Sequence, residues 1–534
     1  MDARQSSGWT ALHEAVHNNQ TGATASLLGA RAGANAMTGD GFSPLHLAVL
    51  GESYGVLAAL LKAGANPKTV DPHGLTPLHV AAEENAVPAA RAILEFAASS
   101  SSAQQGVGLI GVLEARDDLG ATPLHLAALS GGPEVADNLI RAGADLDATT
   151  LAGNTPLHLA AGRGNSRPFH VLLDAGASLQ AADANGWTAL FHACVSDDPA
   201  LVGTTLARGA DLRAVDQFGR SAAHVAAEAG CLQTLRFVVE AGVDVAATDA
   251  QGWTAAYDGC KSGDPAVLAF LVETCGVVLD TSDSAGVSPL HVAVTAGNAP
   301  VVAYVLDVLG LERSAVAVNA LTDGGYAALH LAARQGQADA CGLLLAAGAD
   351  VGLCDDAGET ALHHAVRAGS LACVDVLVAV GGANLGAAAN DGATPLHMAA
   401  VLASDELVAA LLSAGADPNT HDALGLVPLH HAVIERDEES AVVLLCDPRI
   451  GVDAVDDDNR SALHLAADAG DNRLVSLLLD GGAAREIQDS VGCTALHHAG
   501  SCVCVCVWCV LFVFSVCCYQ KLEVLFAFSL LANF

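Results

Sequence analysis

Short amphipathic helices recur along nearly the whole chain. In residues 155–161 (TPLHLAA), the apolar side chains of Leu157, Ala160 and Ala161 follow the i, i+3, i+4 spacing that places them on one face of a helix. The pattern predicts a helix of about two turns, which is too short to be stable alone in water. It therefore needs neighbouring helices that cover its apolar face.

The residues around this helix predict where it begins and ends. Thr155 can act as the N-cap, because its hydroxyl can accept a hydrogen bond from an amide of the first turn. Pro156 falls at the first helical position, where its missing N–H costs nothing. Gly164 is expected to form the C-cap, because glycine accepts the left-handed backbone conformation.

Versions of this motif return at a fixed spacing. With His158 as the mark, the steps are 33 or 34 residues, except for 46 between His79 and His125 and 39 between His291 and His330. Such a period is typical of a solenoid, in which each unit packs on the next. The marked positions are His13, His46, His79, His125, His158, Phe191, His224, Tyr257, His291, His330, His363, His397, His430, His464 and His497.

Turn-forming residues precede each mark. Five residues before it stands Gly, except in one repeat, where Asn459 replaces it. Both residue types tolerate a positive φ. Eight residues before the mark, Asp recurs, and its carboxylate can accept hydrogen bonds from the backbone ahead. These aspartates are Asp71, Asp117, Asp183, Asp216, Asp249, Asp283, Asp355, Asp422, Asp456 and Asp489.

The period and the T-P-L-H-x-A motif resemble the ankyrin repeat. The resemblance covers residues 1–500, with fifteen positions in register. It implies an all-α ankyrin-repeat solenoid of helix-turn-helix units with β-hairpin or loop fingers, curved into a superhelix with a long concave face. It also implies that the marked His hydrogen-bonds turn backbone and so ties adjacent repeats together.

Two longer steps and two unusual repeats interrupt the pattern. A Ser- and Gln-rich insertion near 97–111 is expected to bulge from one loop, and a second insertion near 309–317 is expected to extend a helix. Phe191 and Tyr257 replace the marked His, and Asp258-Gly259 replaces the usual pair of small apolar residues. Local irregularity is expected in these two repeats.

Composition narrows the possible partners. The formal net charge is −36, with 23 Lys plus Arg against 59 Asp plus Glu. Such a surface repels phosphate backbones, so nucleic acid is excluded as a partner. Partner proteins with basic patches are favoured instead. The cysteines of the repeats show no pairing pattern, which favours a reducing, cytoplasmic location, and a monomer is expected.

The C-terminal segment, residues 501–534, abandons the repeat. Residues 502–519 carry no charge and could span a bilayer as a single anchor. Alternating Val and Cys is also what a translated GT-dinucleotide repeat encodes, and the flanks lack the Lys/Arg clusters that orient a span. We therefore favour a gene-model artefact over a genuine membrane segment.

Residues with metal-binding or catalytic potential have structural explanations. His13-Glu14-Ala15-Val16-His17 matches the H-E-x-x-H zinc-protease pattern, but His13 is the repeat's own His. Doubled His at 363–364, 430–431 and 497–498 lie too far apart to share one ion, and the second His of each pair is expected at the surface. We predict no enzyme activity, no cofactor and no metal site.

Aromatic residues share the position just before the N-cap: Trp9, Phe42, Trp187, Trp253 and Tyr326. One interpretation is a hydrophobic staple onto the following helix. The other is a row of partner-binding hot spots. Both alternatives stay open.

Together these observations predict a protein–protein interaction scaffold or adaptor that binds through hairpin tips and the concave helix face. One alternative is the cytosolic ankyrin domain of a membrane-anchored channel or acyltransferase, with residues 502–519 as the span. Another is the regulatory part of an enzyme whose catalytic domain is missing.

Overall fold

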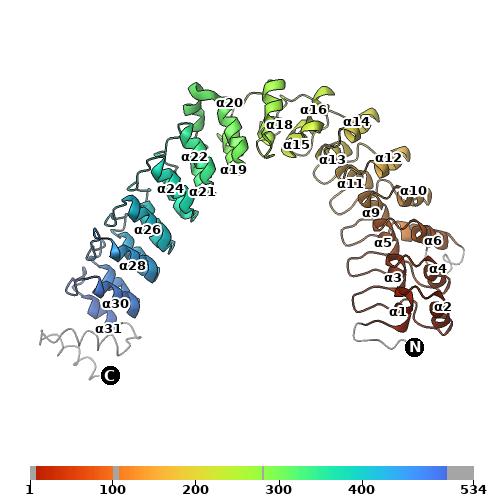
Figure 1. Cartoon of the computed structure of the whole chain (residues 1–534), viewed down its shortest axis with the longest axis horizontal. Coiled ribbons are helices and arrows are strands. Elements are labelled where there is room, and N and C mark those ends of the chain that lie inside the picture. The colour runs from red at the N-terminus through yellow and green to blue at the C-terminus, as the bar shows by residue number, and fades with distance from the viewer. Residues whose placement is uncertain (1–7, 100–107, 280–281, 502–534) are drawn as a thin grey trace. The chain divides into compact units, whose positions relative to one another are not determined.

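The computed structural model describes residues 8–99, 108–279 and 282–501. The chain divides into two compact units, one ending at Val278 and the other beginning at Leu279. Both units consist of paired α-helices joined by tight turns and longer loops (Figure 1).

The helices of the first unit alternate between a first helix, which carries the marked residue, and a second helix. The first helices are α1 (Ala11–His17), α3 (Pro44–Leu50), α5 (Pro77–Glu83), α9 (Pro123–Ser130), α11 (Pro156–Gly162), α13 (Ala189–Val195), α15 (Ala222–Glu228) and α17 (Ala255–Gly259). The second helices are α2 (Thr21–Gly29), α4 (Tyr54–Lys62), α6 (Val87–Ala98), α10 (Pro133–Arg141), α12 (Ser166–Asp174), α14 (Pro199–Ala207), α16 (Leu232–Glu240) and α18 (Pro265–Ala269) with the π-helix η1 (Phe270–Thr274). A short extra helix, α8 (Leu109–Leu113), follows α6.

The second unit repeats the same alternation. Its first helices are α19 (Pro289–Thr295), α21 (Ala328–Arg334), α23 (Ala361–Arg367), α25 (Pro395–Val401), α27 (Pro428–Ile434), α29 (Ala462–Asp468) and α31 (Ala495–Ser501). Its second helices are α20 (Ala299–Val318), α22 (Ala338–Ala346), α24 (Leu371–Ala379), α26 (Asp405–Ala414), α28 (Glu438–Cys446) and α30 (Asn472–Asp480).

Within each unit the first helices form one row and the second helices another. Each first helix contacts the first helices next to it in the row and, except for α31, its own second helix. In the first unit the loops extend from the α1, α3, α5 and α9 row on the side away from α2, α4 and α6 (Figure 1). We call these loops fingers. The core lies between the two rows and consists mainly of Leu, Ala and Val.

Helix α11 shows how the motif forms this core. Thr155 is the N-cap, and its hydroxyl accepts a hydrogen bond from the His158 N–H at 3.4 Å. Leu157, Ala160 and Ala161 are fully buried. The C-cap is Arg163 and not Gly164 as expected, although Gly164 follows it with φ of +70°. The small Ala pair lets neighbouring first helices approach closely.

Most of the buried marked His residues join two repeats, although His430 Nε2 has no hydrogen-bond partner among the described residues. In α11, His158 Nδ1 accepts the backbone N–H of Thr155 at 3.0 Å. Nε2 therefore carries the ring proton and donates it to the carbonyl of Ala181, in the next finger, at 3.0 Å. His46 and His397 make the same bond to the next finger. His158 thus makes both bonds that the resemblance implied.

The fingers are held by side-chain and backbone hydrogen bonds. In all ten predicted turns, Asp Oδ1 accepts the N–H groups two and four residues ahead, as Asp183 does from Asn185 and Trp187. Adjacent finger tips are also joined by backbone bonds. Leu151 N–H donates to the Leu119 carbonyl at 2.9 Å, and Ala423 N–H to the Asp391 carbonyl at 2.9 Å. We call this series of bonds the tip ladder.

The predicted all-α solenoid is confirmed. In the part of the chain that the structure describes, the fingers contain no strand, only two isolated bridges, Cys354–Thr360 and Val455–Ser461. The fingers are therefore loops rather than extended hairpins.

The interruptions of the pattern also have a structure. The second insertion lies in α20, whose backbone departs from helical geometry at Gly310. Irregularity is present in the repeat of Tyr257, where α17 is short and α18 runs into η1, whereas α13, with Phe191, is regular. No helix of residues 8–99, 108–279 and 282–501 is long and apolar enough to cross a bilayer. Residues 502–519, the possible span, lie outside the described residues.

Candidate functional site

The five aromatic residues before the N-caps are all half-buried. Each ring lies against the side chain four residues later, at the third helical position, with centroid distances of 5.2–6.4 Å for Trp9–His13, Phe42–His46, Trp187–Phe191, Trp253–Tyr257 and Tyr326–His330. A hydrophobic staple would reach one residue further. The contact leaves part of each ring at the surface.

Two of these aromatic residues belong to one continuous cluster. In three consecutive repeats, the position before the N-cap holds Trp187, Arg220 and Trp253. We call them the Trp-Arg-Trp row. They come from the fingers that lead into α13, α15 and α17.

Trp187 and Arg220 are joined through Asp216. The Trp187 indole N–H donates to Asp216 Oδ2 at 3.2 Å, and Arg220 Nε donates to the same oxygen at 2.9 Å. Arg220 Nη1 reaches Glu228 Oε2 at 2.6 Å. The guanidinium also lies 5.9 Å from the Trp187 ring centroid and 5.4 Å from that of Phe218, within cation–π range. Burial alone would lower the pKa of Arg220, but the carboxylates of Asp216 and Glu228 outweigh it and raise that pKa.

Trp253 forms a similar arrangement with Lys261. The Lys261 ammonium lies 4.8 Å from the Trp253 ring centroid. It pairs with Asp258 Oδ1 at 2.8 Å and with Glu228 Oε1 at 3.8 Å. Glu228 therefore links the two cations of the cluster, and Trp187 and Trp253 belong to one network.

Asp258 is the residue of this network whose burial costs the most free energy. Its side chain is 1% exposed, and its Oδ2 has no hydrogen-bond partner among the residues that the structure describes. Burial raises the pKa of this carboxyl, although Lys261 opposes the shift. A buried carboxylate oxygen without a donor is unfavourable.

The cluster lies where the marked His is missing. Phe191 and Tyr257 are fully buried and stack on Trp187 and Trp253 at interplanar angles of 28° and 19°. Without a ring nitrogen at the mark, Thr254 Oγ1 has no hydrogen-bond partner in the described part of the chain. The bond from Trp187 to Asp216 spans adjacent repeats and so replaces the tie that a His would make.

Sequence reasoning found the two tryptophans but missed Arg220, Glu228 and Lys261. Arg220 shares their register and could have been found by examining every residue type at that position instead of aromatic residues alone. Asp258 was noted only as a departure from the small-residue pattern. The cluster combines aromatic faces with paired charges, which is a chemistry of binding.

The remaining candidate aromatic residues lie elsewhere. Trp9 packs edge-on against His17 of α1, with centroids 5.3 Å apart. Tyr326, in the second unit, lies beside His364, with centroids 5.7 Å apart. Neither takes part in the Arg220 network.

In the zinc-protease pattern at residues 13–17, both ring nitrogens of the first His already have partners in the protein. His13 Nδ1 accepts the Thr10 N–H at 3.0 Å, and Nε2 lies 2.9 Å from the Ala36 carbonyl. Both ring nitrogens serve the fold, so His13 is not available to a metal.

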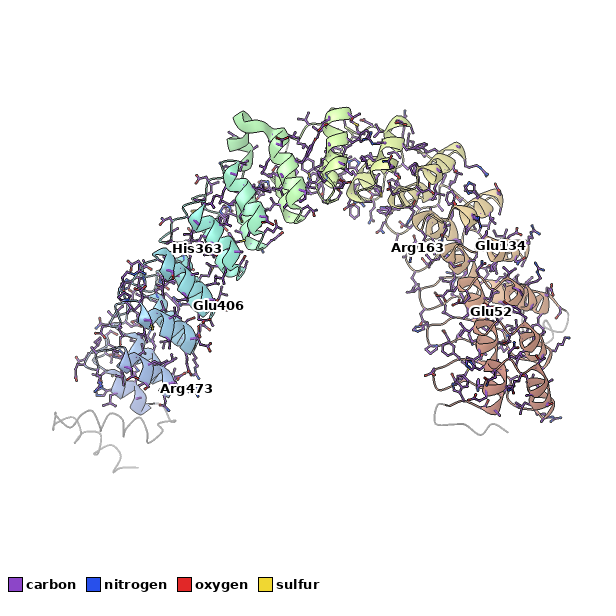
Figure 2. All side chains as sticks on the ribbon, viewed as in Figure 1. Glu52, Glu134, Arg163, His363, Glu406 and Arg473 are labelled. Carbon is purple, nitrogen blue, oxygen red and sulfur yellow. The ribbon has the colours of Figure 1, made fainter. Side chains whose placement is uncertain are left out.

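The expectation that the doubled His are surface residues is wrong for His364, which is buried. His363, labelled in Figure 2, is the marked residue of α23, and His364 follows it. His364 turns back to the finger, where its Nε2 lies 2.9 Å from Asp355 Oδ2. The finger carboxylate provides the polar partner that allows this ring to be buried.

Comparison with known proteins agrees with this architecture. A family model described as ankyrin repeats (3 copies) matches residues 1–71, 53–150, 124–216, 196–283, 260–353, 329–422 and 429–516. Such repeats are a general protein–protein interaction module.

Among curated relatives, the chain is 32% identical to the E3 ubiquitin-protein ligase KEG of Arabidopsis thaliana over 268 residues, which cover 41% of this chain and 16% of that protein. It is 41% identical over 121 residues to human neurogenic locus notch homolog protein 1 (23% of this chain, 5% of that protein) and 38% over 181 residues to human notch homolog protein 2 (34% and 6%). The chain thus spans less than a fifth of the length of these relatives. The repeated fold, its His ties and the matches along its length show that the chain belongs to the ankyrin-repeat family.

Proposed function

We propose that this chain is a cytoplasmic scaffold or adaptor that binds partner proteins through its finger tips and first-helix face. Its main binding point is the Trp-Arg-Trp row. The observation that carries this proposal is the cluster itself: two half-buried Trp rings and an Arg lie in consecutive repeats, with a cation close to each Trp ring. Trp and Arg are the residue types enriched in binding hot spots.

The charge of the chain supports a partner with basic side chains. A net charge of −36 attracts basic surfaces over a distance of about 10 Å in 0.1 M salt. Phe218, 49% exposed at a neighbouring finger tip, offers apolar contact area next to the charges.

The test uses a photo-crosslinking amino acid in place of Phe218 in the full-length protein in cells. We expect it to capture a partner that Trp187→Ala and Trp253→Ala each release, with affinity lowered about 30-fold, as for a hot spot of about 2 kcal/mol. Binding should also weaken as salt rises.

The matched control is Gln233→Ala on α16, an exposed residue of the second-helix row. It should leave capture unchanged. If both Trp variants capture the partner as well as the wild type, or if the yield does not depend on salt, the proposed binding surface is wrong.

The match to a ligase favours a second candidate function. The aligned region is 16% of a protein named as an E3 ubiquitin-protein ligase. The chain would then be the partner-binding region of a longer enzyme. Sequencing the transcript across the codon for Gly500 tests this, because a continuing repeat followed by a catalytic domain is expected in that case.

A further inference from the structure

Among the described residues, four repeats pair a finger Asp with the His that follows the marked position. His Nε2 lies 2.8–3.2 Å from Asp Oδ2 in each pair. The pairs are Asp183–His192, Asp355–His364, Asp422–His431 and Asp489–His498. The Asp and His are nine residues apart in every case, so the repeat geometry brings them together.

At one of these pairs a third metal-ligating side chain joins. Glu359 occupies the position before the N-cap, four residues after Asp355, and its Oε2 lies 3.8 Å from His364 Nε2. The ligand atoms of Asp355, Glu359 and His364 all lie within 4.8 Å of one another, and all three residues are buried. In the described part of the chain, no other group of three His, Cys, Asp or Glu residues meets this spacing. The equivalent position in the other three pairs holds Trp187, Leu426 and Cys493.

The carboxylates of this cluster are oriented by the fold. Asp355 Oδ1 accepts the backbone N–H groups of Ala357 and Glu359, each at 2.9 Å, which leaves Oδ2 facing His364. Burial alone would raise the pKa of Asp355, but these bonds and His364 hold it below its ordinary value. The other Glu359 oxygen, Oε1, pairs with Arg367, whose side chain is 52% exposed. Arg367 can therefore move into solvent and leave Glu359 to another cation.

We propose that Asp355, Glu359 and His364 bind one divalent first-row transition-metal ion, which competes with the Arg367 guanidinium for the charge of Glu359. One imidazole and two carboxylates suit Mn²⁺, Fe²⁺ or Zn²⁺. The ion fixes the finger that carries Asp355 and Glu359 to helix α23, which carries His364.

The surroundings of His364 limit the affinity of this site. When Nε2 binds the ion, the ring proton moves to Nδ1, which has no hydrogen-bond partner among the described residues. The rings of Tyr326 and His330 pack beside it instead. Because an outer-shell partner contributes about 10- to 100-fold in affinity, binding is expected to be that much weaker than at a fully supported site.

The test titrates full-length protein with Mn²⁺ in excess Mg²⁺ and counts free Mn²⁺ by electron paramagnetic resonance. Mg²⁺ occupies the diffuse acidic surface, and Mn²⁺ avoids the thiols that would take up Zn²⁺. We expect one Mn²⁺ per chain above that background, with electron spin-echo modulation from a directly bound nitrogen.

Matched variants separate this site from other acidic groups. Glu359→Gln should weaken binding at least about tenfold, His364→Gln should remove the nitrogen modulation, and Arg367→Gln should strengthen binding because the competing cation is gone. Leu426→Glu adds a third ligand to the Asp422–His431 pair and should raise the stoichiometry to two Mn²⁺ per chain. If the wild type takes up no more Mn²⁺ than Glu359→Gln, or if no nitrogen modulation appears, the site does not exist.

Discussion

A single buried His joins three parts of the chain in most repeats. His158 accepts from the backbone at the start of its own helix and donates to the finger of the next repeat, at 3.0 Å in both cases. The side chain is fully buried, so neither bond competes with water. The residue therefore contributes to the helix start and to the stacking of repeats at once.

Replacing His158 with Phe, the residue type found at the equivalent position 191, should destabilise the helices around it. In His158→Phe, the Thr155 N–H and the Ala181 carbonyl lose their partner, and we expect a cost of about 3 kcal/mol. Hydrogen exchange of α11 and α13 measures it. The control, His17→Phe at an exposed position of α1, should change stability by no more than about 0.5 kcal/mol. Equal effects of the two variants would contradict the role assigned to His158.

The buried His residues also predict acid sensitivity. Burial lowers the pKa of His125, His158 and His430 to about 4. The unfolded chain binds a proton at each of them near pH 6.5, whereas the folded chain does so only near pH 4. Stability is therefore unaffected above pH 6.5 and falls as the pH drops from about 6.5 to 4, by on the order of 3 kcal/mol per His.

Thermal unfolding followed by circular dichroism between pH 7.5 and 4.5 checks this expectation. The melting temperature should fall over that range. His158→Phe should show a shallower fall than the wild type, because one of the groups that bind a proton on unfolding is gone. A melting temperature that rises on acidification would contradict it.

At the residue scale, the features that recur with the period were predictable from the sequence, whereas those specific to a single repeat were not. The tryptophans at 187 and 253 were found because they share a register. Glu359 occupies that register too, but its proximity to His364 depends on how the finger folds back on the first turn of α23. The burial of His364 follows from the same fold and could not be read from a doubled His alone.

At the scale of the element, the finger is the most constrained part of the repeat. Its Asp holds two backbone N–H groups, its Gly takes a positive φ, and its tip bonds to the next finger. The Asp-x-x-Gly spacing predicted this turn. The close approach between neighbouring fingers was not predictable, because it depends on the stacking distance of the repeats.

Two finger glycines should respond differently to the same substitution. Gly153 has φ of +79°, and a Cβ there would lie 2.6 Å from the backbone nitrogen of Ala184. Gly252 has φ of +87° with no atom within 4 Å of such a Cβ. Gly252→Ala should cost about 1–2 kcal/mol from strain alone. Gly153→Ala should cost more, because the tip bond of Ala184 must also shift. Urea titration of both variants measures the difference, and equal costs would contradict the close finger contact.

At the scale of the molecule, stability is local. Each helix contacts its own partner and the repeats on either side, so the free energy of folding is a sum of repeat and interface contributions. The sequence period predicted this organisation. The division of the chain into two compact units at Val278 and Leu279 was not predictable, since the repeats continue in register on both sides.

A substitution in one repeat should therefore leave distant repeats unchanged. In His397→Phe, the bond to the Leu426 carbonyl is lost. Hydrogen exchange followed by mass spectrometry should show faster exchange in α23, α25 and α27 and no change in α1 and α3. Uniformly faster exchange along the chain would indicate a single cooperative unit instead.

In the tip ladder, the groups that hold the fingers together are different from the side chains that the fingers present at the surface. Its bonds use backbone N–H and C=O groups, so the side chains beside them differ freely. The same place in different fingers holds Leu119, Asn185, Phe218, Asp391 and Leu424. Leu119 is 71% exposed there. Side chains at this outer edge can therefore be substituted one at a time with little loss of folding free energy. New binding specificities can evolve on this surface.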